Sequence, residues 1–592
     1  MAVLPPMVLI ETAFKRFENS VTPVDARDFH STELRHVRQA AIEIENWQRQ
    51  RGFLRNMRRI EPFLKAIEKY SKPMDVLCNG TPFLPWVWAP VKLMLQPAAE
   101  YTSIFEKLLD AYGRIAESLP RFDRYRNTFP EADFQHVLAL VYVDIIEFHR
   151  RAYKFFRRRG WKFLFDSLWN NFELRFDAIL SSLSRHRELI DHEAASFDIV
   201  QASENRKMVN KELEKSEEER SSSHLLATLS WLGVEDRLQE DNLSRLNNRR
   251  FPDTCQWLFK TPQYQSWFTE YKKLSVLWLW GIPGPGKTVM SAYIIETLRQ
   301  QPDSTILYYF CDHYLADRNN CSHILRTLAT QLIRHDPELA AFAETPSIER
   351  LRKFLPKLIA ASPFTRIVID GIDECDAKDH KYALDQLLLL CKDIKGHGSL
   401  LVSSREDGII SRKLRQNPTI SLRDEHLAVE RDIEAFIGGK FRQVVEEWDL
   451  DISTNIAAEI QQQLIQRSNG MFLWVELVIG HFQYLLNDED LLGAVYRLPE
   501  SLQDAYDRIV QNIKKVPESS TREKIARMLE WITHANRPLK LYEILNAIGM
   551  DPTDSCDCEP KTVNSRILEF CKPLVEISRA GTVQFIHFSA TE

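Results

Sequence analysis

Eight consecutive residues, from Gly281 to Thr288, constrain this chain more than any other stretch of it. They read G-I-P-G-P-G-K-T, so three glycines within six positions stand directly before a lysine-threonine pair. An apolar run rich in strand formers precedes them at 274–280, and apolar residues at helical spacing follow at 289–298. A strand, a glycine-rich loop and a helix in this order form the setting of a phosphate-binding P-loop. We therefore predict a nucleotide site in an α/β domain with a parallel sheet.

Each position of this loop has a chemical task in such a site. The glycines permit unusual backbone angles and let N–H groups approach phosphate oxygens. Lys287 is expected to lie across the β- and γ-phosphates, and the Thr288 hydroxyl to ligate Mg²⁺. A chance glycine turn is disfavoured, because only 19 of the 592 residues are glycine. The predicted nucleotide-binding residues are Gly281, Ile282, Pro283, Gly284, Pro285, Gly286, Lys287, Thr288 and Val289.

A second segment, T-R-I-V-I-D-G-I-D-E at 365–374, strengthens this prediction. Ile367 to Ile369 read as a buried parallel strand that ends at Asp370, and ligands bind at the carboxyl ends of such strands. Asp370 is then the second magnesium ligand, opposite Thr288. Asp373 and Glu374 are both candidates for the acid that polarises the attacking water, and their spacing does not choose between them. Alone, an apolar run ending in aspartate is more often a strand that meets a turn.

A third apolar run, at 399–404, is followed by Arg405. A guanidinium at the carboxyl edge of the same sheet is able to contact a γ-phosphate and to report its presence. The alternative is a solvated arginine after a strand. The predicted catalytic residues are therefore Asp373, Glu374 and Arg405.

These segments, with three others, resemble the NACHT module of fungal STAND (signal-transduction) ATPases. The others are C-Q-W-L at 255–258, the strand end at 309–310 and N-G-M-F-L-W at 469–474, and the resemblance covers about residues 225 to 592. By this likeness Lys287 contacts phosphate and Arg405 contacts the γ-phosphate. Thr288 and Asp370 would bind magnesium. ATP or ADP with Mg²⁺ is the implied cofactor, with GTP possible because no base-reading residue is identifiable.

The resemblance also implies how the chain is divided. An all-α N-terminal domain is expected at 1–202, a charged linker at 203–224 and the NTPase core at 225–430. A helical subdomain at 431–497 and a winged helix at 498–592 follow. In relatives a winged-helix histidine touches the β-phosphate of ADP, and the matching position here is His587. The alternative for His587 is an ordinary core residue within an alternating apolar strand.

The N-terminal region reads as amphipathic helices interrupted by prolines. The helices are expected at 34–51, 63–70, 101–119 and 134–158, and the prolines at 73, 82, 85, 90, 120 and 130 are expected to end helices or set turns. Trp86 and Trp88 are predicted to fill a core rather than to form an exposed contact. The segment 74–88 resembles a helical domain of unknown function that precedes NACHT modules in fungal proteins. The charged tract from 203 is either a flexible linker or an exposed helix.

Length, charge and cysteine use narrow the class of protein. At 592 residues, three or four domains are expected. A net charge of −6 argues against a generic nucleic-acid binder. No apolar run approaches the roughly 18 residues of a membrane span, and the start of the chain lacks a secretory signal, so a cytoplasmic protein is expected. The basic run at 157–159 is too short to indicate a membrane-binding patch, and Cys556, Cys558 and Cys571 are read as free thiols rather than a metal site.

The functional hypothesis is a nucleotide-controlled switch that is closed with ADP and open with ATP. The resemblance implies self-association on activation, slow ATP hydrolysis as a reset, and a downstream effector reached through the N-terminal domain. It also implies a C-terminal repeat sensor beyond residue 592, in signalling of the fungal innate-immunity or heterokaryon-incompatibility type. Two alternatives stay open: a P-loop enzyme with rapid turnover, such as a kinase or nucleic-acid-dependent ATPase, and a scaffold that binds nucleotide without hydrolysing it.

Overall fold

The structure is a computed structural model of the 592-residue chain, and it divides into two compact units. The first comprises Met1–Ala227 with Pro337–Glu344, and the second comprises Thr228–Asp336 with Thr345–Glu592. The residues described are 5–49, 85–98, 110–115, 131–157, 180–184, 222–235, 237–269, 276–301, 304–312, 320–342, 348–375, 379–447, 453–482, 493–535, 537–549, 563–577 and 581–590, with isolated positions between 61 and 219.

The described part of the first unit is helical. Its longer helices are α1 (Pro6–Glu18), α2 (Pro23–His30), α3 (Leu34–Arg49), α5 (Pro85–Ala98) and α8 (Glu131–Arg157). In its core the Trp86 ring makes edge contacts with Phe14, Phe17 and Phe29 at centroid distances of 4.9, 5.4 and 5.2 Å. Trp86 is fully buried and Trp88 is 5% exposed, so the prediction that both tryptophans fill the core is confirmed.

One proline expectation for this unit is wrong. Pro85 is the first residue of α5, where a missing N–H costs nothing, but Pro90 lies inside the same helix. The helix continues through Pro90 because its apolar side chains, including fully buried Val91 and Met94, pack into the core. Tertiary packing here offsets the loss of one helical hydrogen bond. Pro73, Pro82, Pro120 and Pro130 lie outside the described residues, as does the tract from Arg158 to Lys162.

The charged tract that begins at residue 203 is helical at every position the structure describes. Met208, Lys211, Glu212, Lys215 and Glu219 are helical and mostly exposed, and helix continues from 222 to 232. Lys215 and Glu219 form an ion pair one turn apart at 3.7 Å. Over these positions the tract is an exposed helix rather than a flexible linker.

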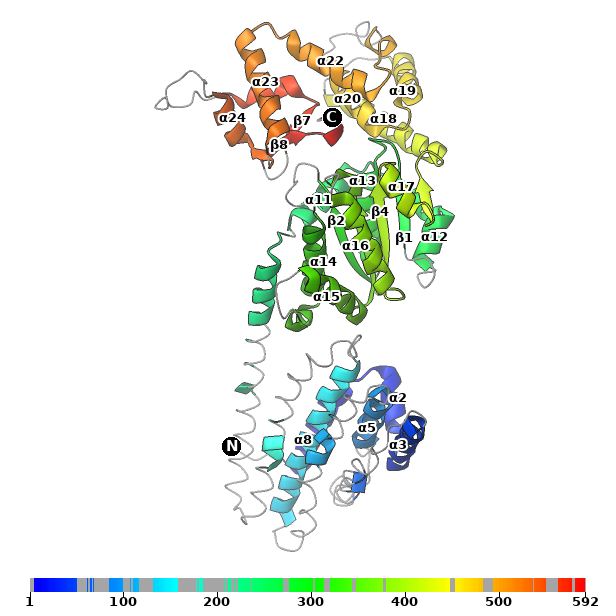
Figure 1. Ribbon diagram of the computed structural model, residues 1–592, viewed down its shortest axis with the longest axis vertical. Helices are drawn as coiled ribbons and strands as arrows, with labels where there is room; N and C mark the ends of the chain where they lie inside the picture. Colours follow the sequence, from blue (N-terminus) through cyan, green and yellow to red (C-terminus); the bar gives the residue numbers. More distant parts are fainter. Residues whose placement is uncertain are drawn as a thin grey trace, which may run out of the picture. The chain divides into compact units, whose positions relative to one another are not determined.

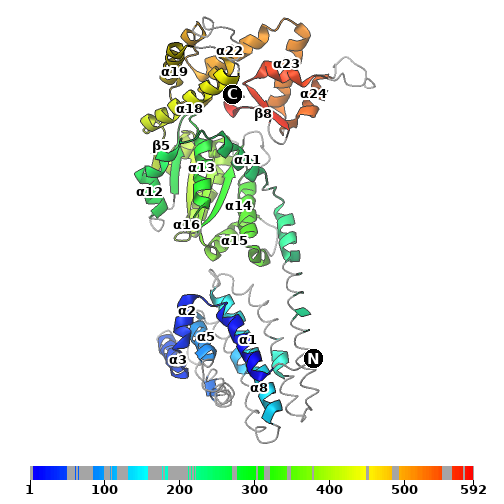
Figure 2. The ribbon, with the colours of Figure 1, turned by 180° about the vertical axis from the view of Figure 1, so that it is seen from behind.

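The second unit is built on a five-stranded parallel sheet (Figures 1 and 2). The strands are β1 (Val276–Trp280), β2 (Ser304–Phe310), β3 (Phe364–Asp370), β4 (Gly398–Ser404) and β5 (Thr419–Ser421), in the order β2-β3-β4-β1-β5. Their interiors are almost wholly buried, which explains why they read as continuous apolar runs rather than alternating ones. The strands predicted around residues 276, 310, 367 and 400 are confirmed.

Helices cover both faces of this sheet, with α13 and α16 on opposite faces (Figures 1 and 2). The helices of this part are α11 (Arg237–Arg249), α12 (Pro262–Thr269), α13 (Lys287–Arg299), α14 (Cys321–His335), α15 (Ile348–Ala361), α16 (Asp379–Asp393) and α17 (Gly408–Leu414). The short helices η1 (Gln256–Lys260) and η4 (Ile372–Glu374) lie before β1 and after β3. Because all five strands are parallel, their carboxyl ends, and the loops that follow them, meet at one edge.

Two further groups of elements complete the second unit. The first consists of α18 (His426–Glu447), α19 (Thr454–Ser468) and α20 (Phe472–Phe482). The second consists of α22 (Leu502–Lys514), α23 (Ser519–His534), β6 (Leu539–Lys540), α24 (Leu541–Gly549), η5 (Ser565–Cys571), β7 (Val575–Ile577), β8 (Thr582–Phe585) and η6 (Phe588–Ala590). The strands of this second group form an antiparallel sheet in the order β6-β8-β7. Helices followed by a small antiparallel sheet are the arrangement expected of a winged helix.

Candidate functional site

The glycine-rich loop lies between β1 and α13, as the sequence predicts. Gly284 and Gly286 have φ of +78° and +89°, angles that only glycine adopts without strain, and α13 begins immediately at Lys287. A Cβ on Gly284 would lie 2.9 Å from the Leu473 Cβ, and the Leu473 N–H donates to the Gly284 carbonyl at 3.3 Å. The loop therefore contacts the start of α20, so its shape and the position of the following helical group depend on each other.

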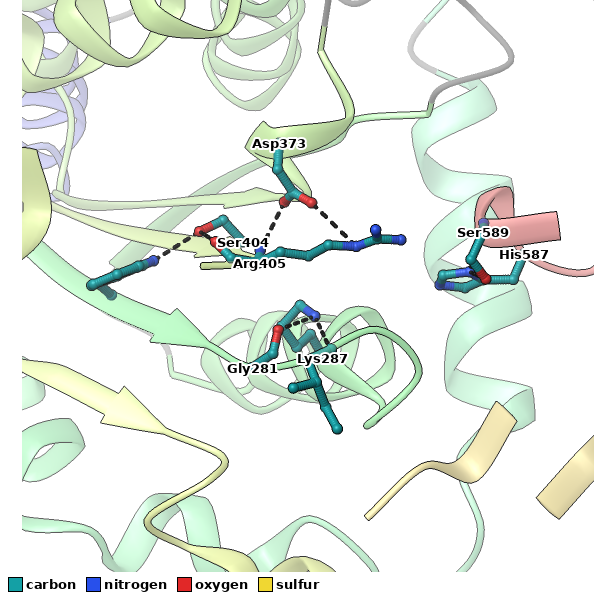
Figure 3. Close-up of polar contacts among 9 residues, drawn as sticks. Gly281, Lys287, Asp373, Ser404, Arg405, His587 and Ser589 are labelled. Carbon is teal, nitrogen blue, oxygen red and sulfur yellow. Dashed lines mark hydrogen bonds and ion pairs between the residues drawn. The ribbon is translucent and has the colours of Figure 1, made fainter. Parts of the chain in front are cut away.

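Lys287 is the first residue of α13, and its side chain contacts the backbone of the loop. Its Nζ donates to the carbonyls of Gly281 at 3.0 Å and Ile282 at 2.8 Å (Figure 3). Burial lowers the pKa of this ammonium group, while the carboxylates of Asp373 and Asp370 act in the opposite direction. A partly desolvated cation among backbone dipoles is suited to the oxygens of a polyphosphate.

Asp370 is the last residue of β3 and is 2% exposed. The hydroxyl of Ser291 donates to its Oδ1 at 2.7 Å, and Ser291 is itself fully buried. Ser291 lies three residues beyond Thr288 on α13, so both hydroxyls belong to the same helical face. The sequence analysis did not identify Ser291. Its spacing of three residues from Thr288 is the signal from which it could have been predicted.

Asp373 and Glu374 occupy different environments. Asp373 Oδ1 accepts the Arg405 backbone N–H at 3.0 Å, and its Oδ2 lies 3.6 Å from Arg405 Nε (Figure 3). Burial raises the pKa of Glu374 well above its usual range, and the carboxylates of Asp373, Asp312 and Asp370 add to this effect. Burial raises the pKa of Asp373 too, but the hydrogen bond from Arg405 opposes that rise. Asp373 is thus hydrogen-bonded to Arg405, and the two adjacent acids differ in their surroundings.

Arg405 follows β4 directly, at the carboxyl edge where the sequence predicted it. The Ser404 hydroxyl donates to the Arg405 carbonyl at 2.9 Å and accepts from the indole N–H of Trp278 at 2.9 Å. These contacts fix the backbone at the end of the strand. Figure 3 shows the Arg405 side chain pointing away from the sheet, toward the side on which His587 lies.

These elements enclose a cavity of about 610 Å³, a size typical of nucleotide-like ligands. The loop from Gly284 to Val289 forms one wall, with Asp373, Glu374 and Arg405 beside it. The other walls come from α11 and the segment after it, from α18 and α20, and from the end of β8. The residues of these walls include Arg245, Arg249, Arg250, Phe251, Thr254, Cys255, Asp312, Phe436, Lys440, Gln443, Phe472, Leu473, Glu476, Gln584 and His587. Gly281, Ile282, Pro283 and Asp370 are not part of the wall, and Ile282 is 47% exposed.

His587 lies beyond the end of β8, not inside a strand, and it lines this cavity. Its Nδ1 accepts the Ser589 N–H at 3.1 Å and lies 2.8 Å from the Ser589 hydroxyl (Figure 3). Burial, with the positive charges of Arg405, Lys287 and Arg249, lowers the pKa of His587 to about 4. A neutral imidazole therefore faces the phosphate-binding loop at pH 7.

A further residue that sequence reasoning missed joins two walls of the cavity. Asp432 on α18 is 7% exposed, and its Oδ2 accepts the Cys255 N–H at 2.7 Å and the Trp257 indole N–H at 2.9 Å. The C-Q-W-L segment is therefore fixed against the helical group. Its partner is 175 residues away from Trp257, and no local pattern connects the two.

The donor set agrees with Mg²⁺ better than with a transition metal. The Thr288 hydroxyl and the Asp370 carboxylate are hard oxygen ligands, and Mg²⁺ is usually held by one or two such groups together with phosphates and water. Across the described ranges, no group of three His, Cys, Asp or Glu side chains is placed to hold a metal ion. Cys571 is a buried free thiol, whereas Cys556 and Cys558 lie outside the described residues.

Three family models match this chain along its length. The model for Nephrocystin 3, N-terminal, a NACHT-type domain, matches residues 253–405, which include the P-loop, Asp370 and Arg405. A domain of unknown function, DUF7708, matches 58–201, and the winged helix domain of GPI inositol-deacylase matches 513–592. No helix in the described part of the chain is long and apolar enough to cross a membrane.

Comparison with known proteins agrees with these matches. Over 363 residues the chain is 26% identical to the vegetative incompatibility protein HET-E-1 of Podospora anserina. The alignment covers 57% of this chain and 26% of that protein, so the chain spans about a quarter of its relative's length.

Among solved structures, the chain matches a Walker-type ATPase of Pyrococcus abyssi with a TM-score of 0.28 and 11% identity, covering 56% of this chain and 94% of that one. It also matches AMPPCP-bound DnaA of Aquifex aeolicus with a TM-score of 0.23 and 11% identity, covering 52% and 87%. At these scores the structural likenesses carry no argument.

The parallel sheet, the P-loop geometry and the family matches define a nucleotide-binding P-loop NTPase module of NACHT type, with a winged helix after it. The predicted fold class and the resemblance to fungal NACHT proteins are confirmed. The finer domain boundaries and the roles of individual site residues remain predictions.

Proposed function

We propose that this chain is a nucleotide-controlled signalling switch that is closed when ADP is bound and open when ATP is bound. The observation that carries the proposal is the composition of the cavity wall. Lys287 of the P-loop and His587 of the winged helix line the same 610 Å³ cavity, together with residues of α18 and α20. A bound nucleotide would thus contact parts of the unit that are far apart in sequence, and its phosphates would affect how those parts pack.

A ligand shifts a conformational equilibrium only if its affinity differs between the two states. Lys287 and Arg405 supply groups that a γ-phosphate would contact. Because ADP has no γ-phosphate, these groups would lack that contact when ADP is bound. The neutral His587 offers a hydrogen bond to a β-phosphate in the closed state. We infer that the γ-phosphate favours opening, and that opening exposes surfaces for self-association.

Thr288 and Asp370 would hold Mg²⁺, which neutralises phosphate charge when bound. Among the acids, Glu374 is the stronger candidate for the general base, because burial and neighbouring carboxylates raise its pKa and so strengthen its carboxylate as a proton acceptor. Hydrolysis would be slow and would return the switch to its ADP state. Activation would cluster the N-terminal domains and engage a downstream effector, in incompatibility-type signalling like that named for HET-E-1. We further propose that the nucleotide is ATP rather than GTP and that the protein acts in the cytoplasm. A repeat sensor beyond residue 592 is also part of this proposal.

The test is to purify the 592-residue chain, denature it, identify any released nucleotide by ion-pair chromatography, and record the native mass. Stoichiometric ADP on a monomer is the expected result, followed by assembly when ATP is supplied to His587→Ala, which lacks the proposed β-phosphate contact of the closed state. An empty site on a monomer that turns over ATP rapidly would overturn the switch proposal. It would favour a P-loop enzyme whose function is to form its reaction product.

A further inference from the structure

Glu576, on β7 of the winged helix, is bonded to two arginines of α11. Its Oε1 lies 3.0 Å from Nη1 of Arg245, and its Oε2 pairs with Nη2 of Arg249. Gln584, on the neighbouring strand β8, donates to the same Oε1 at 3.1 Å. The side chain of Glu576 is 22% exposed, that of Arg245 27% and that of Arg249 36%. Water therefore screens the charges of this cluster less than it screens an ordinary surface pair.

The helix that carries these arginines is itself fixed to the sheet. β2 is an edge strand, and the side-chain amide of Gln239 pairs with both backbone groups of Phe310 at its end. The Phe310 N–H donates to Gln239 Oε1 at 2.8 Å, and Gln239 Nε2 donates to the Phe310 carbonyl at 3.4 Å. The next residue of α11, Glu240, pairs with Arg299 of α13 at 2.5 Å. Because α11 is held to the sheet, any group bonded to α11 is held to the sheet as well.

Both arginines also form part of the nucleotide cavity. Arg245 and Arg249 line it on the side of α11, and the Arg245 Nε is buried without a hydrogen-bond partner among the described residues. The charge of Arg249 contributes to the field at His587, which lines the same cavity. The Glu576 carboxylate therefore fixes two cations at the wall of the site and joins the winged helix to the NTPase sheet.

We propose that Glu576 is a positioning residue of the nucleotide site. By pairing with Arg245 and Arg249 it holds both guanidinium groups at the cavity wall and keeps the winged helix, with His587, closed over bound ADP. This inference rests on the proposed function, because it concerns the closed state of the same switch. An ordinary surface ion pair contributes little to stability, and its loss would not change nucleotide release. The positioning role predicts that loss of the Glu576 carboxylate does change nucleotide release.

The experiment measures the rate at which a fluorescent ADP analogue leaves the full 592-residue chain after excess unlabelled ADP is added. Glu576→Gln is expected to speed release by about threefold to thirtyfold, since it removes one carboxylate shared by two partly buried cations. The matched control is Glu569→Gln, which removes an exposed winged-helix carboxylate that pairs with Lys572, three residues along the chain. The control is expected to release the analogue at the wild-type rate.

A charge reversal separates the ion pairs from a general packing effect. Glu576→Arg places like charges together and should speed release beyond Glu576→Gln. Glu576→Asp keeps the negative charge on a shorter side chain, and should release the analogue more slowly than Glu576→Gln. Should Glu576→Arg not fold, salt gives a second measurement: raising ionic strength should speed release from the wild type more than from Glu576→Gln.

The outcomes distinguish the two proposals. Slow release from the wild type, with the same rate in Glu576→Gln and no difference in salt dependence, would overturn the positioning role alone. A folded Glu576→Arg chain that releases the analogue at the wild-type rate would also overturn it. A wild-type chain that binds no ADP analogue would overturn the proposed function itself.

Discussion

The carboxylate of Asp373 accepts the backbone N–H of Arg405 at 3.0 Å, while its second oxygen lies 3.6 Å from the Arg405 Nε. The turn after β3 and the end of β4 are thereby joined at the edge of the sheet that carries the P-loop. Two adjacent acids that the sequence left equivalent are separated by this contact. We propose that Asp373 orients the arginine and that Glu374 acts as the base.

This difference predicts different effects when each of the two acids is replaced by its amide. Glu374→Gln should lower single-turnover ATP hydrolysis by about 10²- to 10⁴-fold with nucleotide binding retained, which is the usual contribution of a general base. Asp373→Asn should instead reduce the preference for ATP over ADP, because Arg405 loses its charged partner. Rapid-quench hydrolysis and equilibrium binding of both nucleotides measure the two effects. The assignment is reversed if Asp373→Asn stops hydrolysis and Glu374→Gln does not.

Lys287→Ala should weaken nucleotide binding by roughly tenfold to 150-fold, the cost of removing a hydrogen bond to a charged group. In the structure its Nζ has the loop carbonyls of Gly281 and Ile282 as partners, so the side chain is already held where phosphate oxygens would lie. Isothermal titration with ADP measures the change, and Lys514→Ala on the exposed side of α22 is the control. An unchanged affinity of Lys287→Ala for ADP would contradict the P-loop assignment.

Ser291→Ala should raise the Mg²⁺ concentration needed for half-maximal hydrolysis by about tenfold, the order expected when a hydrogen bond that orients a metal ligand is removed. The Ser291 hydroxyl donates to Asp370 at 2.7 Å, and both residues are buried, so removing the hydroxyl takes a partner from a carboxylate that has little access to solvent. Asp370→Asn should shift the Mg²⁺ requirement in the same direction and further.

Thr297→Ala is the control for this pair, because the Thr297 hydroxyl donates only to the Tyr293 carbonyl one turn back on the same helix. It should leave the Mg²⁺ requirement unchanged. An unchanged requirement in Asp370→Asn would place the metal ligand elsewhere.

The sheet and the phosphate-binding edge could be predicted because their signals are local. The strand, loop and helix around Gly284 lie within about twenty-five residues, and Asp370 and Arg405 each end a buried apolar run. The fold then brings these three positions together, since parallel strands share a carboxyl edge. Periodicity and glycine placement were sufficient for this part.

The remaining parts of the site depend on contacts that the sequence does not encode locally. Asp432 joins Trp257 across 175 residues, and Glu576 joins Arg245 across 331. Such partners are fixed only when the winged helix and the helical group pack against α11 and the P-loop. The error at Pro90 has a related cause, because a core formed by distant helices stabilises α5 beyond what its own residues indicate.

His587 should make the stability of the nucleotide-free protein depend on pH. Its pKa in the folded chain is about 4, below the value near 6.5 expected when unfolded, because burial and three nearby cations disfavour the charged ring. Between these two values the unfolded chain binds more protons than the folded chain, so stability falls as the pH is lowered from 6.5 toward 4.

From pH 7 to pH 5 this group should therefore contribute a loss of at most about 2 kcal/mol, since each pH unit below 6.5 is worth about 1.4 kcal/mol. His587→Gln keeps an acceptor for the Ser589 N–H and does not titrate, so its loss over the same range should be smaller. Urea unfolding of both nucleotide-free chains at pH 7 and pH 5 gives the comparison. Equal losses in the two chains would contradict the burial of His587 beside these three cations.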